Sequence, residues 1–164
     1  MHHFSRTGGS IIRWTVDGQD MMRRSNEVAI ASTDPLQLAS FPLVPYSNRI
    51  GHCRFDQWQT MHVKLNFPPE AHAIHGIGWK RAWAARTTTA NMCELTIVHA
   101  ADENWPWAFS ASQRITLNHG ALHMELSATN LEDKAYPLGF GHHPYFDAEG
   151  ATLQFNAASM ADER

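Results

Sequence analysis

Residues 139–146, Gly-Phe-Gly-His-His-Pro-Tyr-Phe, hold side chains that could move a proton. An imidazole has an unperturbed pKa of about 6.5, so it can give or take a proton near neutral pH. Pro144 biases His143 toward an extended backbone and removes one amide donor, so we expect His143 near a strand end. Tyr145 adds a hydroxyl and a flat ring next to it. The alternative is a turn in which both histidines are merely polar.

Two upstream segments could add polar groups to such a site. Residues 42–50 read Pro-Leu-Val-Pro-Tyr-Ser-Asn-Arg-Ile. The two prolines exclude a helix interior, so we expect this segment to present Asn48 and Arg49 on an extended loop. Residues 72–79 read His-Ala-Ile-His-Gly-Ile-Gly-Trp. The two glycines would allow the backbone there to approach a ligand closely.

These three segments, in this order and at these separations, resemble the aldose 1-epimerase (galactose mutarotase) family. The marks of that family are an Asn-Arg-Ile, a His-Gly followed shortly by a Gly-Trp, and a His-Pro-Tyr-Phe, and all three are present. The resemblance runs from about Gly8 to the C-terminus, whereas the family domain is nearly twice as long as this chain. It implies a single mutarotase-like antiparallel β-sandwich domain over residues 1–164, truncated at its C-terminal side.

The resemblance also implies an activity, the interconversion of the α and β anomers of a free hexose by acid–base ring opening. By resemblance, His143 is the general acid that protonates the ring oxygen, and His75 is the second active-site histidine. Asn48 and Arg49 match the sugar-binding pair of the family, and Tyr145 matches another substrate contact. The implied substrate is a small aldose, and the family uses no metal or other cofactor.

One departure from the family concerns the catalytic base. In the family this base is a glutamate near the end of the domain, and a sugar-binding aspartate precedes it. The chain stops before either position, and Glu149, Asp162 and Glu163 are too close to the His143 segment to match them. We therefore expect a fragment that lacks half of the acid–base pair.

Two other classes of protein fit parts of the pattern. A non-catalytic carbohydrate-binding or sugar-sensing β-sandwich would keep Asn48, Arg49 and the aromatic residues without turnover. A metal-binding β-barrel would use imidazoles as ligands, because three or four of them can hold a transition metal. Its ligands would come from His72, His75, His142 and His143. No carboxylate accompanies these histidines in a recognisable ligand pattern, which disfavours the metal site.

The composition sets further bounds. A chain of 164 residues is long enough for one domain with a core. The net charge is −3 and no basic patch occurs, so nucleic acid and anionic membranes are poor partners. No apolar run reaches bilayer length and no leader-like segment opens the chain, so we expect a cytoplasmic protein. Cys53 and Cys93 are expected to be free thiols in a reducing compartment.

Periodicity predicts strands joined by tight turns. Alternating apolar residues over 12–16 lead into Asp17-Gly18, which is a strong hairpin signal. A period of two runs over residues 107–117 and continues over 122–128, which predicts a long hairpin with one buried face. The turn of this hairpin is expected at residues 118–120.

Shorter strands are expected at residues 28–31, 95–97 and 153–155. No long segment has the 3.6-residue period of a helix, so the predicted class is all-β and antiparallel. We expect Trp83 to be a core residue. A sandwich cut partway leaves strands without neighbours, so self-association through open sheet edges is also expected.

Overall fold

The computed structural model describes residues 4–56, 60–147, 149–152, 154 and 156. Strands dominate the described part, which contains one α-helix. Every ladder between its named strands is antiparallel, so the predicted all-β, antiparallel class is confirmed. None of the helices in these ranges has the length and apolar character needed to span a lipid bilayer.

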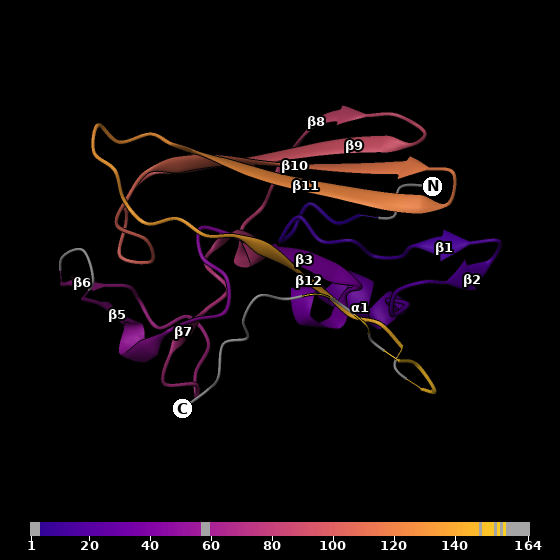
Figure 1. The fold of residues 1–164 in the computed structure, drawn as a ribbon, viewed down its shortest axis with the longest axis horizontal. Coiled ribbons are helices and arrows are strands. Elements are labelled where there is room, and N and C mark those ends of the chain that lie inside the picture. Colours follow the sequence, from indigo (N-terminus) through magenta and orange to yellow (C-terminus); the bar gives the residue numbers. More distant parts are fainter. Residues whose placement is uncertain (1–3, 57–59, 148, 153, 155, 157–164) are drawn as a thin grey trace.

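The largest sheet has four strands in the order β11-β10-β9-β8 and forms one layer of the molecule (Figure 1). Its strands are β8 (Ala84–Thr88), β9 (Met92–His99), β10 (Phe109–Asn118) and β11 (Ala121–Asn130). His119 and Gly120 join β10 to β11 with φ angles of +47° and +79°. The long hairpin is therefore where the two-residue period predicts it.

The inner face of this sheet is well covered on β10 and poorly covered on β11. Phe109, Ala111 and Ile115 of β10 are buried. The corresponding residues of β11 are only half-buried; they are Leu122, Met124, Leu126 and Ala128. Within the described residues, β11 pairs with β10 on one side only. One apolar edge of the sheet therefore remains open.

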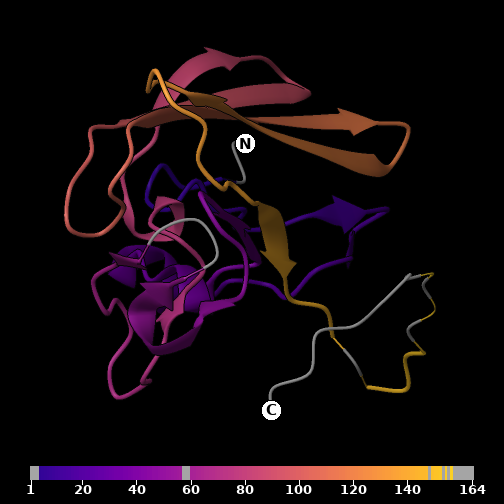
Figure 2. The same cartoon turned by 60° about the vertical axis from the view of Figure 1, so that its left-hand side comes forward.

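A second layer lies beneath the sheet and carries the residues of interest. Strands β3 (Ser40–Leu43) and β12 (Gly141–Pro144) pair with His143 opposite Phe41. Figures 1 and 2 show this pair running below the four-stranded sheet. All four residues of β3 are buried, so β12 is held against the core.

Three small ladders complete the strands. Their members are β1 (Thr15–Val16) with β2 (Gln19–Asp20), β4 (Arg49–Ile50) with β7 (Ala73–Ile74), and β5 (Arg54–Phe55) with β6 (Met61–His62). Asp17 and Gly18 link β1 to β2 with φ angles of +50° and +81°, as a tight hairpin turn requires. The hairpin predicted at Asp17-Gly18 is confirmed.

The strand predicted at residues 28–31 is wrong, because these residues lie in helix α1 (Glu27–Ser32). Asn26 Oδ1 accepts a hydrogen bond from Ala29 N at 2.8 Å and so caps the first turn. Thr33, in the left-handed region, ends the helix. The apolar side chains that suggested a strand do not define a buried face, since Val28 is 77% exposed.

The remaining elements are the 3₁₀ helices η1 (Pro35–Gln37), η2 (Gly51–Cys53) and η3 (Gly78–Lys80). Trp83 is fully buried, as predicted, and lies in the same core cluster as Leu95 and Phe109. Cys53 and Cys93 are free, also as predicted. Residues 153 and 155, which define the last predicted strand, lie outside the described residues.

Candidate active site

His143 lies near the end of β12 with its ring packed against two aromatic side chains. Its imidazole stacks on Phe41 of β3, with 4.9 Å between ring centroids and 13° between planes. The ring of Tyr145 lies 4.8 Å away on a tilted plane. Because Pro144 cannot donate to the ladder and ends the strand, Tyr145 follows directly as a loop residue. The environment of His143 is thus aromatic, and the residue is half-buried.

His75 directly follows β7 and adopts a left-handed backbone with φ +61°. Its amide donates to the carbonyl of Asn48 at 2.8 Å. The side chain of Asn66 holds the residues on both sides. It accepts from Ile74 N at 2.9 Å and donates to the carbonyls of Ile74 at 2.7 Å and Gly76 at 3.0 Å. This network stabilises a conformation that is otherwise unfavourable for a residue with a Cβ.

Gly76 has φ +70° and packs against the chain that follows β3. A Cβ at this position would lie 2.2 Å from the carbonyl oxygen of Val44, so the site admits only glycine. That oxygen accepts hydrogen bonds from the amides of Ile77 and Gly78, each at 2.9 Å. The close backbone approach that the glycines suggested is therefore made to the protein's own chain.

These two arrangements bring His75 and His143 together. Their imidazoles meet nearly edge to face, with 5.1 Å between centroids and 71° between planes. Nδ1 of each ring is buried and has no hydrogen-bond partner among the described residues. Nε2 is therefore the ring nitrogen of each histidine that could meet a bound molecule.

His75 and His143 both have a pKa below that of a free imidazole. Burial is the largest cause of the lowered pKa of His75, and the nearby His143 and Arg49 add to it, bringing the pKa to about 4. The pKa of His143 is also lowered, chiefly by burial; the positive charge of Arg23 adds a smaller lowering, and a backbone hydrogen bond partly opposes both. Burial disfavours the charged form of a histidine, as does a neighbouring cation. His75 is thus neutral at pH 7.

Asn48 and Arg49 lie beside His75. Asn48 has φ +53° and binds His75 through its carbonyl, and Arg49 pairs with Ile74 in the β4–β7 ladder. Nη1 of Arg49 lies 2.8 Å from Oε2 of Glu70, and both side chains are about one-third exposed. Asn48 thus lies on a loop beside His75, as expected, whereas Arg49 is the first residue of β4 and not a loop residue.

The four histidines of the alternative metal site do not converge, since only the rings of His75 and His143 are in contact. His142 turns to the other side of β12, where its Nε2 lies 3.0 Å from Oε1 of Gln113. Nδ1 of His72 accepts from the amide of His52 at 2.9 Å. Within the described ranges, no group of three or more His, Cys, Asp or Glu side chains could hold a metal ion.

Several contacts at the site involve residues that the sequence did not single out. Phe41 stacks on His143, Asn66 fixes His75 and Glu70 binds Arg49. Arg23 lies over the ring of Tyr145. No local sequence pattern marks Asn66, Glu70 or Arg23, because each contacts its partner from a different segment of the chain. Phe41 directly precedes the Pro-Leu-Val-Pro segment, which is the only signal that could have found it.

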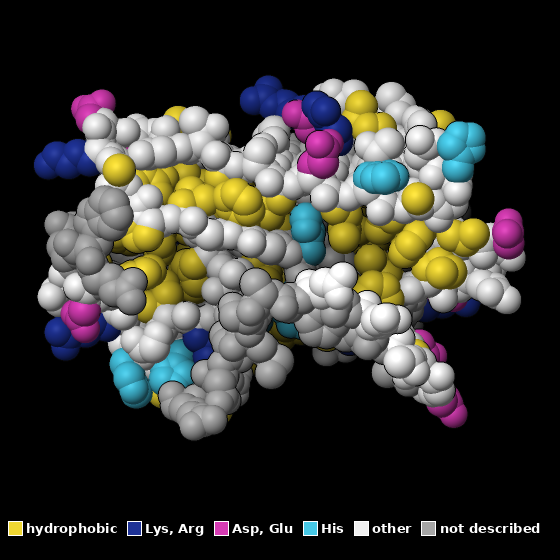
Figure 3. Space-filling model, in the orientation of Figure 1, with side chains coloured by type: hydrophobic (Ala, Val, Ile, Leu, Met, Phe, Trp, Pro, Cys, Tyr) yellow, Lys and Arg dark blue, Asp and Glu magenta, His cyan; other side chains and the backbone are white. Residues whose placement is uncertain are grey.

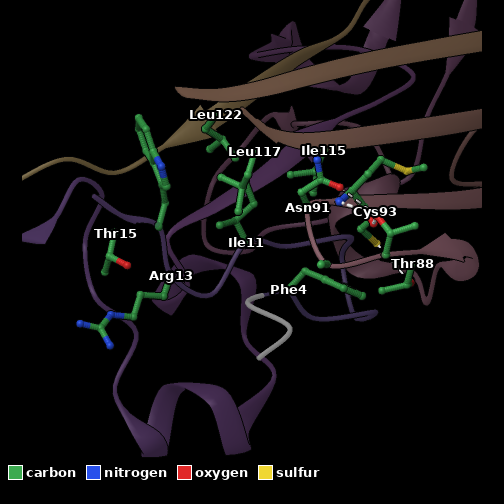
Figure 4. A pocket seen from close by; sticks show the side chains of 14 residues that line it. Phe4, Ile11, Arg13, Thr15, Thr88, Asn91, Cys93, Ile115, Leu117 and Leu122 are labelled. Carbon is green, nitrogen blue, oxygen red and sulfur yellow. Dashed lines mark hydrogen bonds between the residues drawn. The ribbon is translucent and has the colours of Figure 1, made fainter. Parts of the chain in front are cut away.

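A cavity of about 200 Å³ lies elsewhere in the molecule. Figure 4 shows it between the N-terminal segment, with Phe4 and Ile11, and the sheet, with Ile115 and Leu122. Its lining includes none of Asn48, Arg49, His75, His143 or Tyr145. The candidate site is thus distinct from this cavity.

Known proteins are similar to most of this chain in sequence and structure. A family model described as aldose 1-epimerase matches residues 1–162. The uncharacterized protein YphB of Escherichia coli K12 is 31% identical over 163 residues, which are 98% of this chain and 53% of YphB. The chain therefore spans about half the length of this curated relative.

Solved structures agree in fold. A candidate aldose 1-epimerase from Escherichia coli K12 superposes with a TM-score of 0.76 at 29% identity, over 87% of this chain and 47% of that protein. A galactose mutarotase-like protein from Clostridium acetobutylicum gives 0.72 at 18% identity, over 87% and 46% of the two chains. With its antiparallel sheets and the match over residues 1–162, this chain belongs to the aldose 1-epimerase family.

Proposed function

We propose that this chain carries the proton-donating and sugar-binding side of an aldose 1-epimerase site that acts on a free hexose. One observation carries the proposal. His75 and His143 come from distant segments, yet their ring centroids are 5.1 Å apart, and Asn48 and Arg49 lie next to His75. Among the described residues, no carboxylate bonds to either imidazole, which suits groups kept available for a ligand.

Mutarotation requires two proton transfers across one sugar. A base removes the proton of the anomeric hydroxyl while an acid protonates the ring oxygen, and the bond between the anomeric carbon and the ring oxygen breaks. The end of the open-chain aldehyde rotates. The ring then closes on the other face of the aldehyde, and each proton returns to the group that gave it. Each well-placed transfer contributes about 10²–10⁴-fold to the rate.

In this reaction His143 would donate to the ring oxygen through Nε2. The lowered pKa of His143 works against its charged form in the chain as it stands. A carboxylate close to an imidazole raises its pKa, because it stabilises the imidazolium. We therefore propose that the C-terminal part of the family domain supplies the base. Its negative charge would also raise the pKa of His143 and so favour the protonated imidazole.

His75 and Arg49 have binding roles in this proposal. A neutral His75, with a pKa of about 4, can give one hydrogen bond to a sugar hydroxyl or oxygen without competing for the acid role. Arg49 presents a planar fork of donors that suits neighbouring hydroxyls. Asn48 can both donate and accept. Tyr145 offers a ring and a hydroxyl beside His143.

The test uses a chain completed with the C-terminal half of the family domain. Polarimetry on freshly dissolved α-galactose and α-glucose measures anomer exchange, and calorimetry measures sugar binding. We expect exchange above the buffer rate, and we expect Arg49→Ala to weaken sugar binding more than it lowers turnover. The matched control is Arg54→Ala, since Arg54 is an exposed arginine paired with Asp56.

Two outcomes would reject this function. Sugar binding without exchange in the completed chain would identify a carbohydrate-binding or sugar-sensing protein. Equal sugar affinity in the wild type and Arg49→Ala would remove Arg49 from the sugar site.

A further inference from the structure

Arg23, in the segment after β2, is joined to Tyr145 through both its backbone and its side chain. Its amide donates to the carbonyl of Tyr145 at 2.9 Å. Its guanidinium carbon lies 3.7 Å from the centroid of the Tyr145 ring, which is a close cation–π contact. The amide of Tyr145 in turn donates to Ala39 at 2.9 Å. Tyr145 is therefore fixed from two sides.

The same guanidinium also reaches the segment that leads into β3. Nη2 of Arg23 donates to the carbonyls of Leu36 at 2.6 Å and Leu38 at 2.5 Å. Leu38 is fully buried and lies two residues before Ser40, where β3 begins. One side chain thus bridges the end of β12, which carries His143, and the start of β3, the strand that pairs with it.

We propose that Arg23 is a positioning residue for His143, holding Tyr145 and β3 so that the imidazole stays packed against both Phe41 and Tyr145. The inference rests on the proposed role of His143 as the acid. Phe41 stacks on one face of that imidazole at 4.9 Å, and Tyr145 lies at 4.8 Å. Loss of the bridge would free Tyr145 and open the imidazole to water.

Arg23 also contributes charge at this place. The titratable groups around His143 are Arg23, Tyr145 and His75, whereas Phe41 of β3 has no titratable group. The cation opposes protonation of His143 and so supports the neutral imidazole. Arg23 therefore affects His143 in two ways, by holding its neighbours in place and by its positive charge.

The test follows the reactivity of His143 in the 164-residue chain and needs no enzymatic activity. Diethyl pyrocarbonate acylates neutral imidazoles, so the pH dependence of labelling reports the pKa, and fragment ions distinguish His143 from His142. In Arg23→Gln we expect His143 to label faster and its midpoint to move to higher pH, because a cation that opposes protonation is lost. Arg23→Lys, which keeps the cation, should stay near the wild-type midpoint.

Arg24→Gln is the matched control, because Arg24 is the adjacent arginine and is exposed. It should leave the labelling of His143 unchanged. A folded Arg23→Gln protein with the wild-type rate and midpoint at His143 would overturn the proposal. Because the readout is chemical, this result would be distinct from a failure of the completed enzyme to exchange anomers.

A second pair of variants covers the case in which Arg23→Gln does not fold. Tyr145→Phe keeps the ring beneath the guanidinium, whereas Tyr145→Leu removes it. We expect wild-type labelling of His143 in the first variant and faster labelling in the second. Equal labelling in the two would overturn the proposal as well.

Discussion

His142 and Gln113 form a buried hydrogen bond of 3.0 Å between β12 and β10. Nε2 of Gln113 donates to the carbonyl of Gly9 at 2.7 Å, so Oε1 accepts from His142. Adjacent residues on a strand point to opposite faces, which is why His143 turns to Phe41 and His75 instead. The bond anchors the strand that carries the proposed acid to the large sheet.

Replacing Gln113 with methionine should destabilise the protein by about 1–3 kcal/mol, the cost of leaving buried polar groups unpaired. Methionine keeps the approximate length of the side chain, so little volume is lost. Urea denaturation gives the free energy of unfolding. Arg114→Gln is the control on the same strand, because Arg114 is 54% exposed and exposed ion pairs contribute little. Equal stability of the Gln113→Met and Arg114→Gln variants would contradict the structural role of this bond.

Replacing Gly76 with alanine should lower the free energy of unfolding by more than about 1 kcal/mol. The new methyl group would lie 2.2 Å from Val44 O, and the backbone has φ +70°. Gly139→Ala is the control, since a Cβ there meets nothing within 4 Å and the residue does not have positive φ. Thermal unfolding of both variants tests the prediction, and a Gly76→Ala protein as stable as Gly139→Ala would refute it.

Stability should fall as the pH is lowered from about 6.5 toward 4. His75 has a folded-state pKa of about 4, below its unfolded value near 6.5. Between these values the unfolded chain binds more protons, so stability rises with pH there and is lost as the pH falls. His142 and His143 shift in the same direction through burial.

Unfolding free energies measured from pH 4 to 8 test this dependence. His75→Gln should flatten the slope between pH 4 and 6.5, whereas His123→Gln, on the exposed side of β11, should leave it unchanged. An identical slope in the wild type and His75→Gln would show that His75 is not buried as described.

The chain alone should self-associate. Figure 3 shows hydrophobic side chains gathered in a band below the four-stranded sheet. Leu122, Met124 and Leu126 of β11 are only half-buried, and within the described part β11 has a partner on one side only. Open edges and uncovered apolar faces favour pairing with other chains. Light scattering after size exclusion measures the mass, and we expect oligomers that become monodisperse when the C-terminal half is supplied.

The sequence predicted the elements that depend on local signals. The two hairpins follow from alternation and from the turns at Asp17-Gly18 and His119-Gly120, whose φ angles are positive. The different faces of His142 and His143 follow from the period of a strand. Helix α1 was missed because a single cap at Asn26 outweighs weak periodicity over six residues.

The contacts that shape the candidate site were beyond sequence reasoning. Glu70 reaches Arg49 and Asn66 reaches His75 from a different segment of the chain. Arg23 meets Tyr145 across most of the sequence. Such polar contacts depend on where the fold brings side chains together, and no spacing within one segment encodes them.

The most direct measurement of the central claim is anomer exchange by the completed chain with His143 replaced by alanine. The loss of a general acid should lower turnover by about 10²–10⁴-fold, while sugar binding through Arg49 and Asn48 is largely kept. Polarimetry over a range of α-galactose concentrations separates turnover from binding. A His143→Ala protein that exchanges anomers at nearly the wild-type rate would contradict the account.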